Sequence, residues 1–196
     1  MTQPKTPSGV APGMAPRADL WKPVLLRSAV ALVFGAVTIF WAAPSVEVMG
    51  WSGGLYLLST GLLLLWGIRA SGFAKESAPG KLHSSAGSVL AGAGAALLLL
   101  HGDLLFGVIA ALGLAVAGAL ELFCGLKFCG RHVLARDWIA SGIIGLGTAA
   151  ILPFFVSLGA HALLGVAGGG AIISAVLWAL AGLTIRHDAR SNAGTP

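Results

Sequence analysis

The sequence predicts an all-α integral membrane protein with six transmembrane helices and both termini in the cytoplasm. The chain of 196 residues is 57% hydrophobic and only 10% charged, whereas soluble domains carry about 25% charged residues. Its apolar segments reach the ~20 residues that a helix needs to cross a bilayer. All twelve Lys and Arg residues fall on one side of these segments, which the positive-inside rule assigns to the cytoplasm.

The apolar segments favour helices over the strands of a β-barrel. Barrel strands alternate between apolar and polar residues over about 10 residues, and the longest runs here, such as LYLLSTGLLLLWGI, do not alternate. The third span is short and rich in Gly and Ala. The six expected spans are 23–43, 49–68, 84–100, 104–126, 138–157 and 162–185.

Two tails flank one membrane domain. Residues 1–20 contain four Pro and no apolar run, so they predict a disordered cytoplasmic tail. Residues 188–196 are expected to form a second, shorter disordered tail. The membrane domain spans residues 21–187. Tryptophans near the span ends are expected to form an interfacial aromatic belt: Trp21, Trp41, Trp51 and Trp138.

The membrane domain is expected to contain three helical hairpin repeats. A shift of 57 residues along the chain aligns three glycines of one hairpin with three of the next. The segment from Trp21 to Arg69 has the same length as that from Trp138 to Arg186. Repeats of one unit usually build a continuous core. The three hairpins are placed at 21–70, 81–128 and 136–187.

Small residues are expected to pack the helices, because they let helix backbones approach closely in lipid. This packing would lie inside the monomer or between protomers, so a homo-oligomer is one expectation. Small-xxx-small spacing occurs at Gly87/Ala91/Ala95, Ala115/Ala119 and Gly165/Gly169. The aligned glycines expected to pack are Gly35, Gly50, Gly61, Gly92, Gly107 and Gly118.

The first hairpin resembles the repeat of the HdeD-like acid-resistance membrane protein family. The residues that carry the resemblance are Trp21, Arg27, Gly35, Pro44, Gly50 and Gly61. The second hairpin keeps its three glycines but has His101 in place of the Pro, and the third keeps Trp138 and Pro153. The resemblance implies a bacterial inner-membrane protein linked to acid stress. It implies no enzymatic activity and carries over no catalytic residue.

Two ionisable residues, Arg27 and Glu121, are expected inside the membrane near its cytoplasmic side. Burying charge in lipid is costly, so such residues are candidates for function. Both are close enough to the interface for their charged ends to reach it. They could instead pair with each other and lock two hairpins together. A structural and a functional role both remain open for this pair.

The outer turns contain titratable residues but no Lys or Arg. They are Glu47, His101, Asp103 and His161. Because His titrates near pH ~6.5, acidification would make this face more positive, and we treat it as a candidate pH-responsive face. Two His and two carboxylates could also form a weak metal site. The simplest alternative is that short turns need some polar residues at the lipid–water boundary.

The remaining sequence features suggest neither an enzyme nor a cofactor. There is no HExxH and no GxxxxGK[ST] motif, and Cys124 and Cys129 have no accompanying His or Cys pair for zinc. The net charge of +5 lies in loops, which favours anionic lipid head groups over nucleic acid as a partner. The sequence therefore predicts a non-enzymatic membrane protein for acid or envelope stress. The alternative is a small transporter, channel or substrate-binding membrane subunit.

Overall fold

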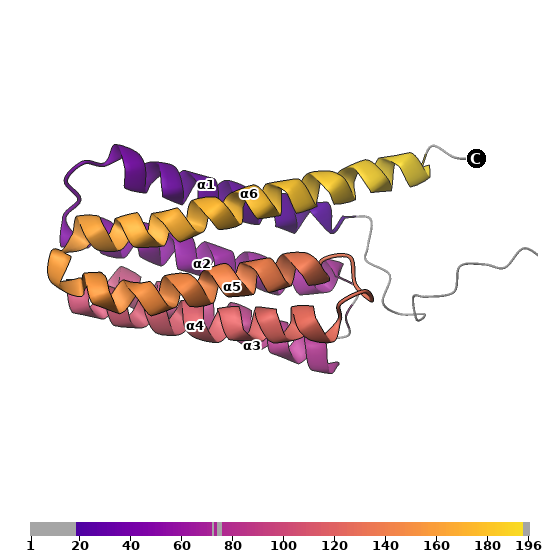
Figure 1. Cartoon of the computed structure of the whole chain (residues 1–196), viewed down its shortest axis with the longest axis horizontal. Helices are drawn as coiled ribbons and strands as arrows, with labels where there is room; N and C mark the ends of the chain where they lie inside the picture. Colours follow the sequence, from indigo (N-terminus) through magenta and orange to yellow (C-terminus); the bar gives the residue numbers. More distant parts are fainter. Residues whose placement is uncertain (1–18, 72, 74–75, 194–196) are drawn as a thin grey trace, which may run out of the picture.

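A computed structural model describes residues 19–71, 73 and 76–193. This part of the chain is helical and contains no strand. In chain order the elements are α1 (Trp21–Phe40), α2 (Val46–Ala70), α3 (Ala78–Leu99), α4 (Asp103–Lys127), α5 (Ala135–Ile151), the 3-10 helix η1 (Leu152–Leu158) and α6 (Ala160–Ala193) (Figure 1).

Short polar or glycine-containing breaks set the helix ends. The side chains of Ser45 and Ser77 accept hydrogen bonds from the backbone N–H groups of Val48 and Gly80, so each serine caps the start of its helix. The chain turns from η1 into α6 at Gly159, whose φ of 81° is a left-handed conformation that favours glycine. The fifth span ends in the 3-10 helix η1, which has Pro153 in its first turn.

Consecutive helices run antiparallel, so every Lys and Arg of the described residues lies toward the same end of the bundle (Figure 1). We call this the basic end; it holds the start of α1 and the end of α6. The other end, which we call the opposite end, carries the α1–α2, α3–α4 and α5–α6 connections. Six spans in the described chain are long and apolar enough to cross a membrane, the fifth being α5 with η1. The chain is a multi-pass membrane protein.

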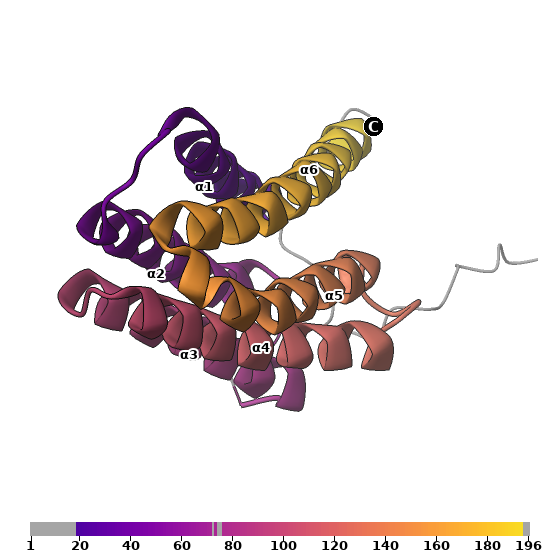
Figure 2. The ribbon, with the colours of Figure 1, turned by 60° about the vertical axis from the view of Figure 1, so that its left-hand side comes forward.

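The most extensive helix contacts lie between the expected hairpins rather than within them. Helix α2 packs along α3, α4 along α5, and α6 along α1. Figures 1 and 2 show α1 with α6 on one side of the bundle and α3 with α4 on the other. The contact between α6 and α1 closes the six helices into a ring.

Glycines bring the backbones together along these pairs. A Cβ added at Gly61 would meet backbone atoms of Gly87 and Ala91 in α3, and one at Gly118 would meet the carbonyl of Gly142 in α5. Such contact leaves no room for a side chain and maximises van der Waals packing. Three other expected packing glycines also face neighbouring elements: Gly35, Gly50 and Gly107.

Gly92 does not pack against another helix of the monomer. A Cβ there would meet nothing within 4 Å, and the residue is exposed on α3. The residue that faces α2 is Gly94, whose added Cβ would meet Leu58 and Gly54. Two residues along a helix correspond to about 200° of rotation, so Gly92 points away from the α2–α3 contact.

The small-xxx-small pair at Gly165 and Gly169 also lies outside the monomer's packing. Both residues are exposed on α6, and a Cβ at either position would meet nothing within 4 Å. Helix α6 instead approaches α1 through Gly168, which faces Thr38. The sequence spacing identified a stripe of small residues on α6, but it did not identify the face of α6 that packs against α1.

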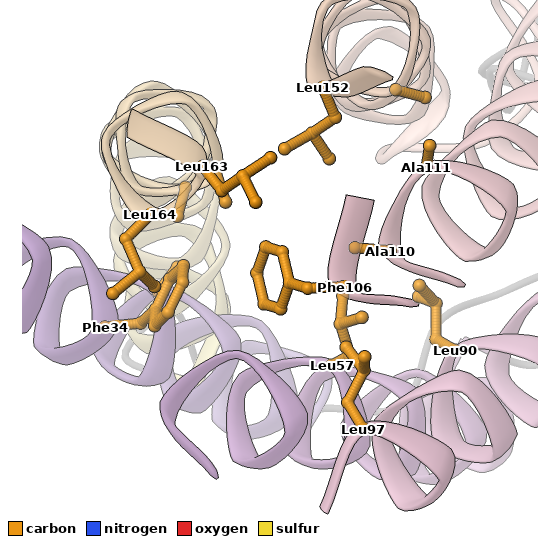
Figure 3. Packing of buried hydrophobic residues seen from close by; sticks show 14 of the residues in the cluster. Phe34, Leu57, Leu90, Leu97, Phe106, Ala110, Ala111, Leu152, Leu163 and Leu164 are labelled. Carbon is orange, nitrogen blue, oxygen red and sulfur yellow. The ribbon is translucent and has the colours of Figure 1, made fainter. Parts of the chain in front are cut away.

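Large apolar side chains fill the half of the bundle near the opposite end. Figure 3 shows Phe106 at the middle of this core, with Phe34, Leu57 and Leu163 around it. Phe34 also stacks on Tyr56, with ring centroids 4.4 Å apart. Other fully buried side chains of this half are Met49, Leu97, Leu152 and Leu164.

Several expected boundaries need correction. Helix α6 continues through Ala193, into the segment 188–196 expected to be disordered, because each added residue gains a helical hydrogen bond and no Pro or Gly interrupts it. Arg190 in its last turn also favours the helix dipole. Helix α3 begins at Ala78, earlier than the expected span 84–100. Of the expected tail 1–20, residues 1–18 lie outside the described chain.

The expectation that Trp138 belongs to the aromatic belt was wrong. Trp138 is only 3% exposed and packs inside the basic end, whereas Trp41 and Trp51 are about half exposed near the opposite end. Trp66, which was not expected in the belt, is 44% exposed on α2. The sequence places a tryptophan near a helix end but does not reveal which side of the helix carries it.

Candidate functional site: the buried Arg27–Glu121 pair

Arg27 of α1 and Glu121 of α4 meet inside the bundle. The Arg27 Nη1 atom lies 2.7 Å from Glu121 Oε1, and the side chains are only 12% and 3% exposed. Gly118 and Gly125 lie on the same buried side of α4 and hold it close to α5, which keeps Glu121 inside the ring. The structure thus brings the two intramembrane charges together.

Arg27 also contacts α5 and α6. Its guanidinium carbon lies 4.5 Å from the ring centroid of Trp178, a cation–π arrangement. Its Nη2 atom donates a long hydrogen bond of 3.4 Å to Ser141 Oγ. One arginine therefore contacts side chains on three other helices. Because charges are costly in apolar surroundings unless they are paired, these contacts make the arginine tolerable there.

A cavity of about 40 Å³ adjoins the pair, and we call it the central cavity. Its polar lining comes from five helices: Arg27, Tyr56, Thr60, Glu121, Ser141, Ser174 and Trp178. Three buried atoms of this lining have no hydrogen-bond partner among the described residues: Thr60 Oγ1, Glu121 Oε1 and Trp178 Nε1. Glu121 Oε1 lies close to Arg27 Nη1, but the geometry of this contact is not that of a hydrogen bond.

Aromatic rings pack together at the basic end of the bundle. Phe73, His83, Phe128, His132 and Trp138 form this aromatic cluster, in which the His83 and His132 rings lie 4.4 and 4.6 Å from the Trp138 ring. The cluster joins the end of α2, the start of α3 and the α4–α5 loop.

His132 is held as a neutral ring. Its Nδ1 accepts a hydrogen bond from the Leu134 backbone N–H at 3.1 Å, so its Nε2 carries the proton and donates to the Ser71 carbonyl at 3.2 Å. Burial lowers the pKa of His132 below its ordinary value of 6.5, an effect that the hydrogen bond to Ser71 opposes. If Nδ1 were protonated, its N–H would point at the Leu134 backbone N–H, and the two donors would repel each other.

The outer-face residues lie at the opposite end but do not form one cluster. His101 lies beside Gly50, with its ring 6.0 Å from the Trp51 ring, and is close enough to Glu47 for their charges to interact. Asp103 and His161 make no ion pair or hydrogen bond with described residues, and His161 is exposed.

The described residues contain no group of three or more His, Cys, Asp or Glu side chains placed to hold a metal ion. The four outer-face residues are therefore not brought together into the weak metal site that was considered. Cys124 is buried in α4, Cys129 is exposed in the α4–α5 loop, and both are free thiols.

Sequence reasoning identified Arg27 and Glu121 but missed the residues around them. Trp178 lies deep in the apolar run of α6, and an indole N–H at that depth usually needs a partner, which was a usable signal. Ser141 and His132 gave no such signal. Serine is common in membrane helices, and a loop histidine does not reveal that it turns inward.

No protein-family model, curated protein or solved structure matches the chain. The resemblance to the HdeD-like family therefore stays a prediction based on the residues given above.

Proposed function

We propose that this chain is a non-enzymatic multi-pass protein of the bacterial inner membrane that supports acid or envelope stress tolerance. The basic end faces the cytoplasm, where its Lys and Arg side chains contact anionic lipid head groups. The protein acts by assembling, with itself as a homo-oligomer or with partner proteins, and needs no cofactor. The resemblance of the first hairpin to the HdeD-like family gives the proposal its physiological direction.

The contact set of Arg27 carries the proposal. Arg27 lies beside Glu121, over Trp178 and within reach of Ser141, so four helices meet at one charge. Intramembrane charge is costly and is retained where it serves function. A site that holds four helices together suits a protein that must keep its shape while the envelope is under stress.

The test is survival after acid shock in a strain that lacks the gene. The deletion strain should be acid-sensitive, and the wild-type gene should restore survival. Glu121→Gln should restore it poorly at equal membrane abundance. Thr38→Val is a matched control, because Thr38 is buried but its hydroxyl bonds within its own helix to Gly35. Normal survival of the deletion strain would contradict the proposal.

The same strain tests the outer face. Joint alanine substitution of His101, Asp103 and His161 should reduce survival if titration at the opposite end contributes to the response. Full rescue by this variant would remove the outer face from the mechanism and leave the role with the bundle interior.

A second candidate function is a small transporter, channel or substrate-binding membrane subunit. The central cavity favours it, because transporters commonly bind their substrates between helices near the membrane midplane. Specific uptake or a current in vesicles that contain the purified protein would support this candidate. The first proposal predicts neither.

A further inference from the structure

The volume of the central cavity limits the size of any ligand beside the ion pair. The central cavity measures about 40 Å³, and one water molecule needs about 10–15 Å³. The space therefore suits about three or four water molecules.

Two buried atoms of the central cavity have no partner among the described residues: Trp178 Nε1 needs an acceptor, and Thr60 Oγ1 can donate or accept. Glu121 Oε1 has an ion-pair contact with Arg27 Nη1 but no aligned hydrogen bond, so it can still accept one. The three side chains are 5% exposed or less. Buried polar groups without a protein partner are normally satisfied by ordered water. Water meets all three needs, because it supplies donors and acceptors together.

A second cavity of about 40 Å³, which we call the inner cavity, continues toward the basic end. It is lined by Arg27 and Trp178 on its deep side, which it shares with the central cavity, and by Leu20, Ser71 and Leu134 near the basic end. His83 also lines it, and the buried His83 Nε2 atom has no partner among the described residues. The two cavities thus form a series from the basic end to Glu121.

The other half of the bundle differs in chemistry. Beyond Tyr56, the interior is closed by the stacked ring of Phe34 and by the apolar core around Phe106. Apolar cavities and contacts in proteins remain dry. The cavities on the basic-end side of the ion pair therefore have polar groups for water, Arg27, Ser71 and His83 among mainly apolar neighbours, whereas the core around Phe106 is made of apolar side chains.

We propose that the interior holds a one-sided hydrated path, in which water molecules of the inner and central cavities connect the basic end with the Glu121 carboxylate and stop at the apolar core. The ligand class is water and the protons it carries. This inference stands apart from the stress-tolerance proposal, because it concerns only which atoms contact water.

Radiolytic hydroxyl-radical footprinting of the purified protein in lipid nanodiscs tests the path, because radicals formed from internal water oxidise the side chains beside that water. The rate for each residue is divided by its rate in the unfolded chain. Trp178 and Phe106 are matched, both being 2% exposed. We expect the normalised rate of Trp178 to exceed that of Phe106 several-fold.

Two outcomes would overturn the inference. Equal protection of Trp178 and Phe106 would show that the cavities are dry. Equal oxidation of both would show general opening of the bundle rather than a one-sided path. As a second measurement, Thr60→Val removes one polar atom from the central cavity and should lower Trp178 oxidation. Thr38→Val should leave it unchanged, and the same loss in both variants would also count against the path.

Discussion

Arg27 and Glu121 carry opposite charges in contact, so each lowers the free-energy cost of burying the other inside the bundle. Glu121→Gln leaves a buried guanidinium without its carboxylate. We expect it to lower the free energy of unfolding by about 3–5 kcal/mol, the usual cost of breaking a buried pair from one side. Reversible unfolding in detergent micelles measures this loss.

The matched control is Glu47→Gln, which removes an exposed carboxylate and should change stability by less than about 0.5 kcal/mol. The double variant Arg27→Met with Glu121→Leu removes both charges and should recover most of the loss. A double variant less stable than Glu121→Gln would show that the pair contributes net stability beyond mutual neutralisation.

His132 should make stability depend on pH. Its pKa is lowered in the folded protein, so between that value and 6.5 the unfolded chain binds a proton that the folded chain does not. The stabilisation is therefore complete above about pH 6.5 and is lost as the pH falls through the folded value. His132→Gln should flatten this part of the melting-temperature profile.

The control for this experiment is His187→Gln, because His187 is 82% exposed on the last turns of α6. It should leave the pH profile of the wild type unchanged. If His132→Gln keeps the wild-type profile, another group causes the dependence.

Single residues show where sequence reasoning reached its limit. Arg27 and Glu121 could be identified because charge inside an apolar run is conspicuous. Trp138 was assigned to the lipid interface and is buried instead, since the sequence gives its depth along the helix but not its direction. Thr60 is one polar residue in an apolar run, and only the structure puts it in the lining of the same cavity as Glu121.

At the scale of helices, glycine contacts explain which helices pair. Gly61→Ala places a methyl group against backbone atoms of α3 and should cost about 1–3 kcal/mol of stability, as overpacking does. Gly92→Ala is the matched change on α3, where the added Cβ meets nothing within 4 Å. It should be neutral or stabilise by up to about 1 kcal/mol through helix propensity.

Melting temperatures of the two glycine variants in one detergent make the comparison. Equal destabilisation by Gly61→Ala and Gly92→Ala would mean that α2 and α3 are not in backbone contact in the membrane.

Helix positions could be predicted far better than helix partners. Apolar run length indicated the six spans, and their number agrees with the structure. Partner choice could not be predicted in the same way, because all apolar helix faces are similar in lipid and association depends on local shape. The extent of α6 past residue 187 was missed because its polar sequence lacks the apolar signal used to find spans.

For the whole molecule, the arrangement of basic residues predicts orientation. Cys129 lies exposed in the α4–α5 loop at the basic end, and Ala43 is exposed in the α1–α2 connection at the opposite end. In a Cys124→Ala background, a membrane-impermeant maleimide added to intact cells should label Ala43→Cys and spare Cys129. Each cysteine is tested alone, with Cys129→Ser in the Ala43→Cys protein.

Permeabilised cells provide the control, since Cys129 should then react. Labelling of Cys129 in intact cells would place the basic end outside and overturn the proposed topology.

The length of α6 has a practical consequence. Its 34 residues span about 51 Å at 1.5 Å per residue, well beyond a hydrocarbon layer of about 30 Å. At the basic end α6 continues as one uninterrupted helix to Ala193 (Figure 1). A helical marker protein fused in phase after its last turn would inherit the orientation of the bundle. That rigid handle would let single-particle imaging align a membrane protein of only 196 residues.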